Sequence, residues 1–358
     1  MVYDAYGARP EVREVPAPSC PPDGVLVRVE ATGVCRSDWH AWQGHDPVPL
    51  PMVPGHEFAG TVAEVGAEVG AGIGAGVGAG VGPEGDGWSV GERVTAPFVL
   101  GCGRCAYCRA GDQQVCPDQQ QPGFTYPGSW AELVAVPSAA ANLVRLPDGV
   151  DPVAAASLGC RFATSYRALR THGQVGPGQD VVVHGCGGAG LAAVMIARAL
   201  GARVLAVDVG AEARRRAREL GAAEVLDPAE VPDVAARVHE LTDGGAHVSV
   251  DAVGDPAVAS ASVACLRRRG RHVQVGLLLG DDARAGLPMD LVVAHELQVL
   301  GSHGMPAGDY PGMLALIAAG TLDPARLVGA VVDLDGAAGA LQAMGGPARG
   351  GGITVVRV

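Results

Sequence analysis

Residues 180–208, DVVVHGCGGAGLAAVMIARALGARVLAVD, contain the pattern on which the fold prediction rests. Asp180–His184 is a short apolar run typical of a buried strand, and Arg203–Val207 is a second such run. Between them, Gly190–Leu200 has apolar residues at helical spacing and is followed by Gly201, a common residue after a helix C-terminus. A strand, a helix and a second strand in this order predict part of a parallel, doubly wound sheet.

The turn after the first strand is rich in glycine. Gly185, Gly187 and Gly190 form a GxGxxG pattern that includes Gly188, and Asp208 ends the second strand. In this context the first glycine permits a tight turn, the second lets backbone approach a pyrophosphate, and the third lets helix and strand pack closely. The Asp208 carboxylate would bond a ribose diol and repel a 2′-phosphate. The pattern therefore predicts a dinucleotide site that prefers NAD to NADP.

The same alternation continues along the chain. Ala211–Leu220 is predicted as a helix closed by Gly221, and Val248–Val253 and His272–Gly276 are predicted as later strands. Arg214 to Arg216 on this helix are basic groups near Asp208 that could attract a 2′-phosphate. A run of charges is usually a solvated helix face, and this is the interpretation that we adopt.

The first 160 residues have a different composition, which is rich in Val, Gly and Pro. Short alternating runs such as Val25–Glu30 and Gly91–Thr95 predict a β-rich domain of short strands and turns. The tail Val331–Val358 returns to short strands and turns, which indicates that the C-terminus completes this domain. The Gly/Ala/Val run Gly66–Gly87 is predicted to be a loop insertion without chemistry, because ordering so many glycines costs entropy and gains little packing.

Length, charge and cysteine content restrict the function. The 358 residues suffice for two domains, and the net charge of −12 with a pI near 5.2 argues against nucleic-acid and anionic-membrane partners. No basic segment followed by an apolar one opens the chain, and no run of about 18 apolar residues occurs, so we expect neither a signal peptide nor a transmembrane helix. Nine cysteines in such a chain fit a reducing cytoplasm.

Four of these cysteines lie close together in the segment CGRCAYCRAGDQQVC: Cys102, Cys105, Cys108 and Cys116. Two-residue gaps let successive thiolates fold back onto one tetrahedral ion, whereas disulfides between neighbouring CxxC cysteines are strained. Four protein ligands leave no coordination position for a substrate. We therefore predict a structural zinc site, in a lobe spanning about 101–117.

A second set of potential metal ligands is dispersed along the chain. Cys35, His56 and Cys160 come from three distant segments, and three protein ligands are typical of a catalytic zinc with one open position. Taken singly, these residues have ordinary interpretations as a structural thiol, a surface histidine and a buried cysteine. The residues alone leave both interpretations open.

Together the motifs resemble the zinc-dependent alcohol dehydrogenases of the medium-chain dehydrogenase/reductase superfamily. The matching segments are, in chain order, CRSDWH, GHEFAGTVAEVG, WSVGERV, the cysteine lobe, SLGCRFATSY, GCGGAG and GSHGM. The resemblance covers nearly the whole chain and implies an α/β protein. A GroES-like catalytic domain would span 1–161, a Rossmann cofactor domain 162–301, and a C-terminal segment over 302–358 would complete the catalytic domain.

The resemblance also implies which residues act at the metal. Cys35, His56 and Cys160 would bind a catalytic zinc, which gives two zinc ions per chain, with NAD as the cofactor. Glu57 would lie just behind this zinc, and Asp38 would orient His56 through a hydrogen bond.

The resemblance implies further roles for residues of the CRSDWH segment and of the substrate pocket. Ser37 would take the alcohol proton, and His40 would pass it to solvent by way of the cofactor ribose. Arg36 would contact the pyrophosphate. Phe98 and Trp39 would line the substrate pocket, with core packing an equal interpretation of Trp39.

The resulting prediction is a cytoplasmic, NAD-dependent enzyme that oxidises primary or secondary alcohols reversibly to aldehydes or ketones, as a homodimer or homotetramer. Zinc would lower the pKa of the bound alcohol. One alternative is a reductase of the same fold that acts on other carbonyl or alkene substrates, against which the cysteine content argues. Another is a non-enzymatic metal- or nucleotide-binding relative, which would have no need of the proton path through Ser37 and His40.

Overall fold

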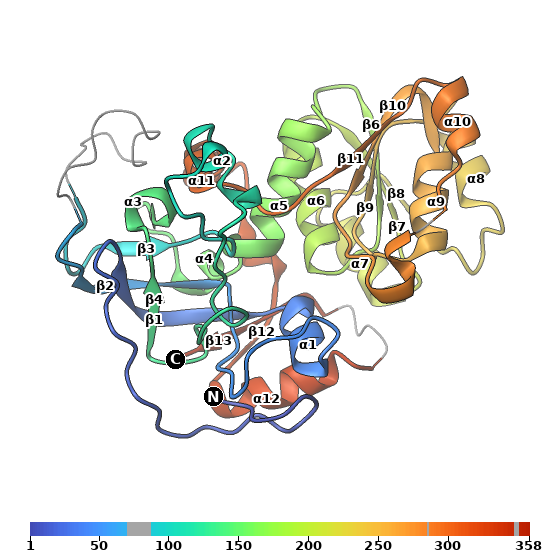
Figure 1. The fold of residues 1–358 in the computed structure, drawn as a ribbon. Coiled ribbons are helices and arrows are strands. Elements are labelled where there is room, and N and C mark those ends of the chain that lie inside the picture. Colours follow the sequence, from blue (N-terminus) through green and yellow to red (C-terminus); the bar gives the residue numbers. More distant parts are fainter. Residues whose placement is uncertain (70–86, 285, 347–350) are drawn as a thin grey trace. The chain divides into compact units, whose positions relative to one another are not determined.

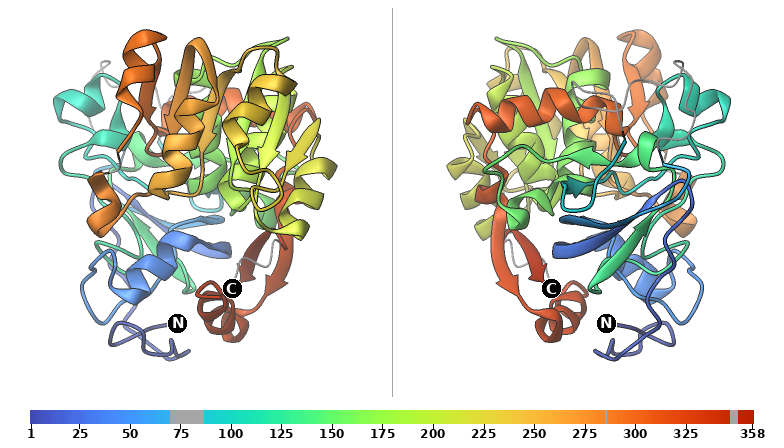
Figure 2. Two further views of the ribbon diagram at one scale, coloured as in Figure 1. Left: turned by 90° about the vertical axis from the view of Figure 1, so that its right-hand side faces the viewer. Right: turned by 90° about the vertical axis from the view of Figure 1, so that its left-hand side faces the viewer.

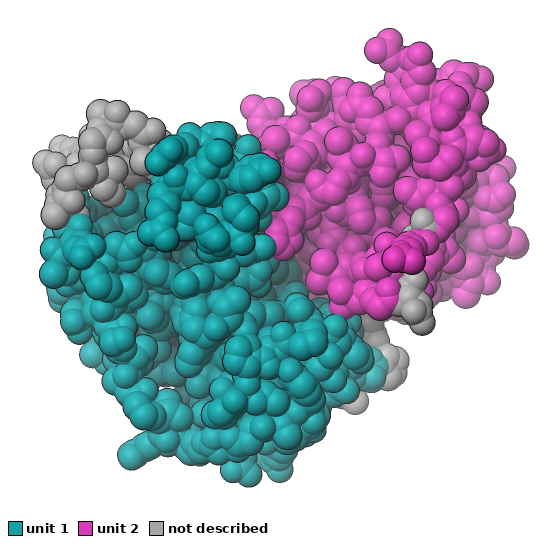
Figure 3. All heavy atoms as spheres, in the orientation of Figure 1, with its two compact units in different colours: residues 1–163, 304–347, 353–358 teal, residues 164–303, 348–352 magenta. Residues whose placement is uncertain are grey.

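The computed structural model describes residues 1–69, 87–284, 286–346 and 351–358. The chain divides into two compact units (Figure 3): unit 1 is Met1–Ala163, Gly304–Pro347 and Ile353–Val358, and unit 2 is Thr164–His303 and Ala348–Gly352. Most of the run Gly66–Gly87, predicted as a loop insertion, lies outside the described residues. No helix within the described ranges has the length and apolar character that a bilayer span requires.

Unit 2 is built on a parallel sheet that has six strands within the described residues. The strands are β6 (Asp180–His184), β7 (Arg203–Val207), β8 (Glu224–Leu226), β9 (Ala246–Asp251), β10 (Leu266–Gln274) and β11 (Gln298–Gly301). Their order is β11-β10-β9-β6-β7-β8, and neighbouring strands are parallel. The valines of β6 are fully buried, as expected of a central strand covered on both faces. This order is that of a Rossmann sheet and confirms the predicted fold class.

Helices cover both faces of this sheet. The helices α6 (Gly188–Ala199) and α7 (Ala211–Glu219) pack against β6 to β8, whereas α8 (Val234–Leu241) and α9 (Pro256–Ala264) lie against β9 and β10. Figure 1 shows α6 on one side of the strands and α8 and α9 on the other, and the left view of Figure 2 shows the yellow and orange helices in front of the sheet. The remaining helical elements near this sheet are α5 (Ala163–Arg167), η3 (Ala168–His172), η4 (Gly280–Arg284) and α10 (Met289–Ala294).

Unit 1 is β-rich and contains the other sheet. Its strands are β1 (Val25–Val34), β2 (Phe58–Val65), β3 (Arg93–Thr95), β4 (Leu133–Val136), β5 (Val144–Arg145), β12 (Val328–Val332) and β13 (Ile353–Arg357). Their order is β12-β13-β1-β2-β3-β5, with β4 also paired to β1. Because β13 is antiparallel to β1, the last strand of the chain belongs to the same sheet as the first (Figure 1).

The helical elements of unit 1 are short apart from α1 (Arg36–Gln43), α11 (Tyr310–Ala318) and α12 (Leu334–Ala343). The others are α2 (Ala106–Arg109), η1 (Gln113–Val115), α3 (Ala139–Asn142), α4 (Pro152–Ala155), η2 (Leu158–Phe162), η5 (Ala307–Asp309) and η6 (Pro324–Leu327).

The helix α12 corrects the prediction for the tail Val331–Val358, where only short strands and turns were expected. Asp333 caps this ten-residue helix by accepting a hydrogen bond from the Gly336 N–H. Ala337 and Leu341, four residues apart, are fully buried and give the helix an apolar face. The two glycines in the segment suggested turns, but each costs a helix only about 1 kcal/mol, which the cap and the buried face can offset.

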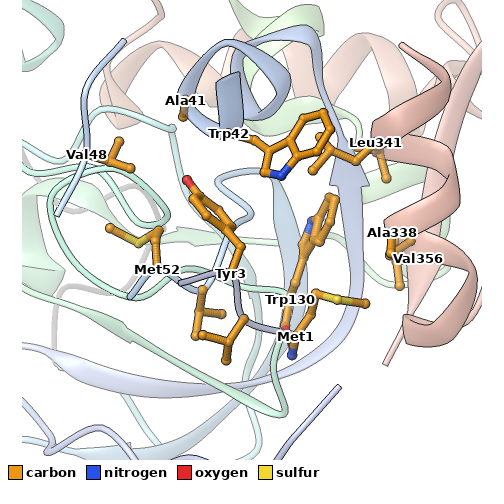
Figure 4. Close-up of a cluster of buried hydrophobic side chains, with 14 of the residues drawn as sticks. Met1, Tyr3, Ala41, Trp42, Val48, Met52, Trp130, Ala338, Leu341 and Val356 are labelled. Atoms are coloured by element: carbon orange, nitrogen blue, oxygen red, sulfur yellow. Dashed lines mark hydrogen bonds between the residues drawn. The ribbon is translucent and has the colours of Figure 1, made fainter. Parts of the chain in front are cut away.

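A cluster of buried apolar side chains fixes α1 within unit 1 (Figure 4). Trp42 from α1 meets Leu341 from α12, and Trp130 and Tyr3 pack in the same cluster. Trp42 is 6% exposed, so it is a core residue, whereas Trp39 is only partly buried at the margin of the cluster. The core therefore holds the helix that carries most of the CRSDWH segment.

Candidate metal centres and cofactor site

Three dispersed ligand residues meet in unit 1. The ligand atoms of Cys35, His56 and Cys160 all lie within 4.8 Å of one another. Cys35 precedes α1, His56 precedes β2, and Cys160 lies in the π-helical turn η2. The Nε2 atom of His56 is buried and has no hydrogen-bond partner among the described residues. A metal ion would satisfy this nitrogen, and two thiols with one imidazole are ligands that zinc prefers, so the residues fit a zinc ion.

Asp38 connects two of these ligands. Its Oδ1 lies 2.8 Å from the Nδ1 of His56 and accepts a hydrogen bond from the Gly55 N–H at 3.2 Å. Its Oδ2 accepts a hydrogen bond from the Cys35 N–H at 2.9 Å. Because the buried carboxylate engages Nδ1, Nε2 is the nitrogen of His56 that remains for a metal.

The two thiols of this cluster differ in acidity. A hydrogen bond from Cys160, together with the Arg161 charge, lowers the pKa of Cys35 well below its usual value in spite of burial. The same hydrogen bond and burial raise the pKa of Cys160. A thiolate is the form of cysteine that binds metals, so the site favours this form at Cys35.

Arg161 is a site residue that the sequence analysis missed. Its Nε donates to Oε1 of Glu57 at 3.2 Å, its backbone N–H donates to the same oxygen at 3.1 Å, and its Nη2 donates to Oε2. Its Nη1 donates to the carbonyl of Val34 at 3.0 Å. Glu57 is fully buried, so the guanidinium compensates a charge that would otherwise be costly. The sequence feature that could have identified Arg161 as a site residue is the presence of an arginine next to Cys160 in a mainly apolar segment.

Aromatic rings and a hydroxyl lie next to the cluster. The rings of Phe98 and His56 meet edge to face with centroids 6.0 Å apart, and Phe124, which the sequence analysis did not select, lies 5.3 Å from His56 in the same way. The Ser37 hydroxyl oxygen is 3.9 Å from the sulfur of Cys35. The structure thus places Ser37 and Phe98 beside the potential ligands.

The other predicted residues of α1 lie around Trp39. The Arg36 guanidinium lies over the Trp39 ring, 5.1 Å from its centroid, and donates a hydrogen bond to the Met344 carbonyl. The His40 ring lies 5.1 Å from Trp39, and its Nδ1 is 3.3 Å from the Nδ1 of His45. The contact between the two histidines was not predicted.

The four lobe cysteines also form a cluster, with all sulfurs within 4.8 Å of one another. The Cys102 and Cys108 sulfurs are 4.0 Å apart, and those of Cys105 and Cys116 are 3.8 Å apart. Two thiolates on one tetrahedral zinc, with Zn–S bonds of about 2.3 Å, are about 3.8 Å apart. A disulfide would need about 2.05 Å, and all four cysteines are free. The spacing fits a closed metal site.

In unit 2, the glycines after β6 have three different surroundings. Gly185 has a φ of +86°, which favours glycine. A Cβ atom on Gly190 would lie 1.7 Å from the carbonyl oxygen of Gly185, so only glycine fits there. A Cβ on Gly187 would meet no atom within 4 Å, and Gly188 begins α6. The backbone at Gly187 is thus accessible at a helix N-terminus, as phosphate binding requires.

Asp208 is linked to this turn by hydrogen bonds. Its Oδ2 accepts from the Cys186 N–H at 2.6 Å, and its Oδ1 accepts from the Gly210 N–H at 2.6 Å. The carboxylate therefore lies at the end of β7 next to the glycine-rich turn, which is the placement that the dinucleotide motif requires.

Two neighbouring arginines of α7 have different surroundings. Arg215 is exposed and pairs with Glu212 along the helix, as expected for a solvated face. Arg214 differs from that prediction, because it is mostly buried, donates to the Asp208 carbonyl at 2.7 Å and pairs with Asp227 at 2.7 Å. Its guanidinium is thus already engaged beside the predicted cofactor site.

Comparisons with known proteins agree with this geometry. Residues 21–148 match the alcohol dehydrogenase GroES-like domain, and residues 188–319 match the zinc-binding dehydrogenase family. An alcohol dehydrogenase of Geobacillus stearothermophilus is 35% identical over 295 residues, which are 82% of this chain and 80% of the relative. The chain belongs to the zinc-dependent alcohol dehydrogenase family of the medium-chain dehydrogenase/reductase superfamily. It is therefore an oxidoreductase.

Other proteins of known activity or known structure are also similar to this chain. A sorbitol dehydrogenase of Halalkalibacterium halodurans is 32% identical, with 86% of this chain and 84% of the relative covered. The solved structure of the alcohol dehydrogenase of Thermus sp. ATN1 covers both chains completely at 31% identity, with a TM-score of 0.85. A zinc-binding dehydrogenase of Sinorhizobium meliloti solved with NADP is 28% identical, covers 97% of this chain and 95% of its own, and has a TM-score of 0.82. A zinc ion and a nicotinamide cofactor are thus supported for this chain.

Proposed function

We propose that this protein is an NAD-dependent zinc alcohol dehydrogenase that interconverts an alcohol with an aldehyde or ketone. The observation that carries the proposal is the cluster of Cys35, His56 and Cys160, in which the buried Nε2 of His56 lacks any other described partner. Three protein ligands leave a coordination position for a substrate oxygen. The four-cysteine lobe would hold a second, structural zinc ion.

The residues around the cluster have distinct roles in this proposal. Zinc, when bound, supplies Lewis acidity that lowers the pKa of an alcohol and polarises a carbonyl group. Asp38 holds the imidazole of His56 in the orientation that presents Nε2. Phe98 and Phe124 cover His56 with apolar surface and would keep water away from the reacting atoms.

A proton path from the substrate is the second part of the proposal. Ser37, whose hydroxyl lies beside Cys35, would accept the proton that an alcohol loses on oxidation. His40, on the next turn of α1, would pass this proton to solvent by way of the cofactor ribose. Arg36 is proposed to bind the pyrophosphate, and Trp39 to line the substrate pocket.

The preference for NAD rests on Asp208. Its carboxylate would accept hydrogen bonds from the adenosine ribose diol and would repel a 2′-phosphate. Arg214, the nearest basic group of α7, is paired with Asp227 and bonded to the Asp208 carbonyl. These bonds would have to be broken before Arg214 could compensate the extra charge of NADP.

A substrate and cofactor panel tests the proposal. Primary, secondary, benzylic and polyol alcohols are each supplied with NAD and with NADP, and formation of the reduced nicotinamide is followed by its absorbance. We expect turnover with at least one alcohol class, faster with NAD, and none in Cys35→Ser. Cys20→Ser makes the same change outside both cysteine clusters and should retain activity.

Two results would contradict the proposal in different ways. Reduction of alkenes or quinones without any alcohol oxidation would indicate a reductase of the same fold. NAD binding without turnover of any alcohol or aldehyde would indicate a non-enzymatic relative.

A further inference from the structure

We propose that His40 and His45 form a binding site for an additional borderline divalent ion, such as Zn²⁺ or Ni²⁺, distinct from both cysteine-containing clusters. Their Nδ1 atoms are 3.3 Å apart, and their rings are 5.6 Å apart at an interplanar angle of 49°. Imidazole nitrogen is a preferred ligand of both ions.

The separation of the two nitrogens suits chelation. Two nitrogens bound to one tetrahedral zinc at about 2.0–2.1 Å are about 3.3–3.4 Å apart, which matches the 3.3 Å between the two Nδ1 atoms. Coordination needs a lone pair on both Nδ1 atoms. The ring that carries its hydrogen on Nδ1 would move it to Nε2, so a neutral pair binds the ion without net proton release.

The end of α1 is shaped to bring the two rings together. Gly44 has a φ of +77° and reverses the chain after the helix. The N–H groups of His45 and Asp46 then both donate to the His40 carbonyl, at 3.0 and 3.3 Å. Trp39 contacts both histidine rings edge to face, with centroids 5.1 and 5.3 Å away. The pair is therefore held by backbone hydrogen bonds and by an aromatic neighbour.

The charges around the pair act in both directions on a bound cation. The site lies at the C-terminal end of α1, where the helix dipole stabilises positive charge. Burial, with the charges of His45 and Arg36, lowers the pKa of His40 and so favours the neutral imidazole that binds metal, whereas Cys35 and Asp46 act in the opposite direction on that pKa. The Asp46 carboxylate would attract the ion itself, and Arg36 would oppose it. His45 is exposed, so an ion can reach the pair from solvent.

Occupation of this site would affect the proposed reaction. A His40 ring with a metal on Nδ1 can no longer exchange a proton at that nitrogen, so excess metal should slow turnover. This consequence rests on the proposed function, whereas metal binding by the pair does not.

Binding of Ni²⁺ to the zinc-loaded, full-length enzyme tests the site by equilibrium dialysis, with released zinc measured in parallel. We expect one Ni²⁺ per chain to bind without zinc release. His45→Gln should weaken this binding by about tenfold or more, because loss of a residue that only orients a metal ligand already costs about that much, and His45 would be a ligand itself. His295→Gln makes the same change in unit 2 and should bind Ni²⁺ like the unmodified enzyme.

The possible results distinguish Ni²⁺ binding at the histidine pair from the effect of that binding on turnover. Equal Ni²⁺ binding by the unmodified enzyme and His45→Gln, or Ni²⁺ uptake matched by zinc release, would overturn the proposed site. The turnover of each protein with Ni²⁺ is then compared with its own rate without Ni²⁺, and only proteins that bind Ni²⁺ at the pair should slow. Ni²⁺ binding that depends on His45 but leaves turnover unchanged would support the site and contradict proton transfer through the Nδ1 of His40.

Discussion

The buried carboxylate of Glu57 depends on a single residue for most of its hydrogen bonds. Arg161→Met would remove the side-chain partners of this carboxylate and leave a buried charge unpaired, which costs about 3–5 kcal/mol. We expect the free energy of unfolding, measured by chemical denaturation, to fall by this amount. Arg237→Met, which breaks an exposed pair with Glu240, should cost no more than about 1 kcal/mol. Similar losses in the two variants would contradict this account of Glu57.

Asp38 offers a second test at the scale of one side chain. Asp38→Asn keeps an oxygen that can accept a hydrogen bond but removes the negative charge beside His56. We expect zinc affinity at the cluster containing Cys35 to fall by about 10–100-fold, because partners that orient a ligating histidine typically contribute this much. Competition with a chelator measures the affinity, and Asp148→Asn, at an exposed position, is the matched control. Unchanged zinc retention in Asp38→Asn would show that Asp38 has no such role.

The sequence predicts those site residues that belong to short motifs. Asp38 and His56 were selected from CRSDWH and GHE, and the structure places them 2.8 Å apart. Arg161 and Phe124 were not selected, because their relevance depends on contacts with Glu57 and His56 from distant segments. No local periodicity or spacing records such contacts.

At the scale of elements, two glycines of the turn before α6 should respond differently to the same change. Gly190→Ala would place a Cβ 1.7 Å from the Gly185 carbonyl oxygen and must displace α6 from β6, so the melting temperature should fall. Gly187→Ala meets no atom within 4 Å, so it should leave stability unchanged and weaken only cofactor binding. Thermal unfolding and NADH fluorescence titration measure the two effects. Normal cofactor affinity in Gly187→Ala would argue against a pyrophosphate at this turn.

The elements were predicted best where burial and turn residues agree. The strands β6 and β7 have their predicted bounds, because each is an apolar run that a glycine or a turn follows. β10 begins at Leu266, before the predicted start at His272, because its first half includes exposed arginines that show no strand pattern. The helix α12 was not predicted because its two glycines are typical of turns. Its stability comes from the cap and from tertiary packing, which the sequence pattern does not show.

At the scale of the whole molecule, the alternation of strands and helices was enough to predict the parallel sheet of unit 2, and the short strands predicted the β-rich unit. The pairing partners were harder to predict. β1 pairs with β13 at residues such as Ala31 and Arg357, which are at opposite ends of the sequence. Pairing between such distant strands depends on tertiary contacts, so the local sequence of either strand does not predict its partner.

Zinc content and turnover, measured together on the unmodified protein, Cys35→Ser and Cys102→Ser, test the central claim most directly. We expect two zinc ions per chain and alcohol-dependent NADH formation in the unmodified protein. Cys35→Ser should remain folded, lose one zinc and lose turnover, whereas Cys102→Ser should lose the lobe zinc and unfold at a lower temperature. Full activity with one zinc per chain, turnover in Cys35→Ser, or a Cys102→Ser protein that is inactive but as stable as the unmodified protein would contradict this assignment.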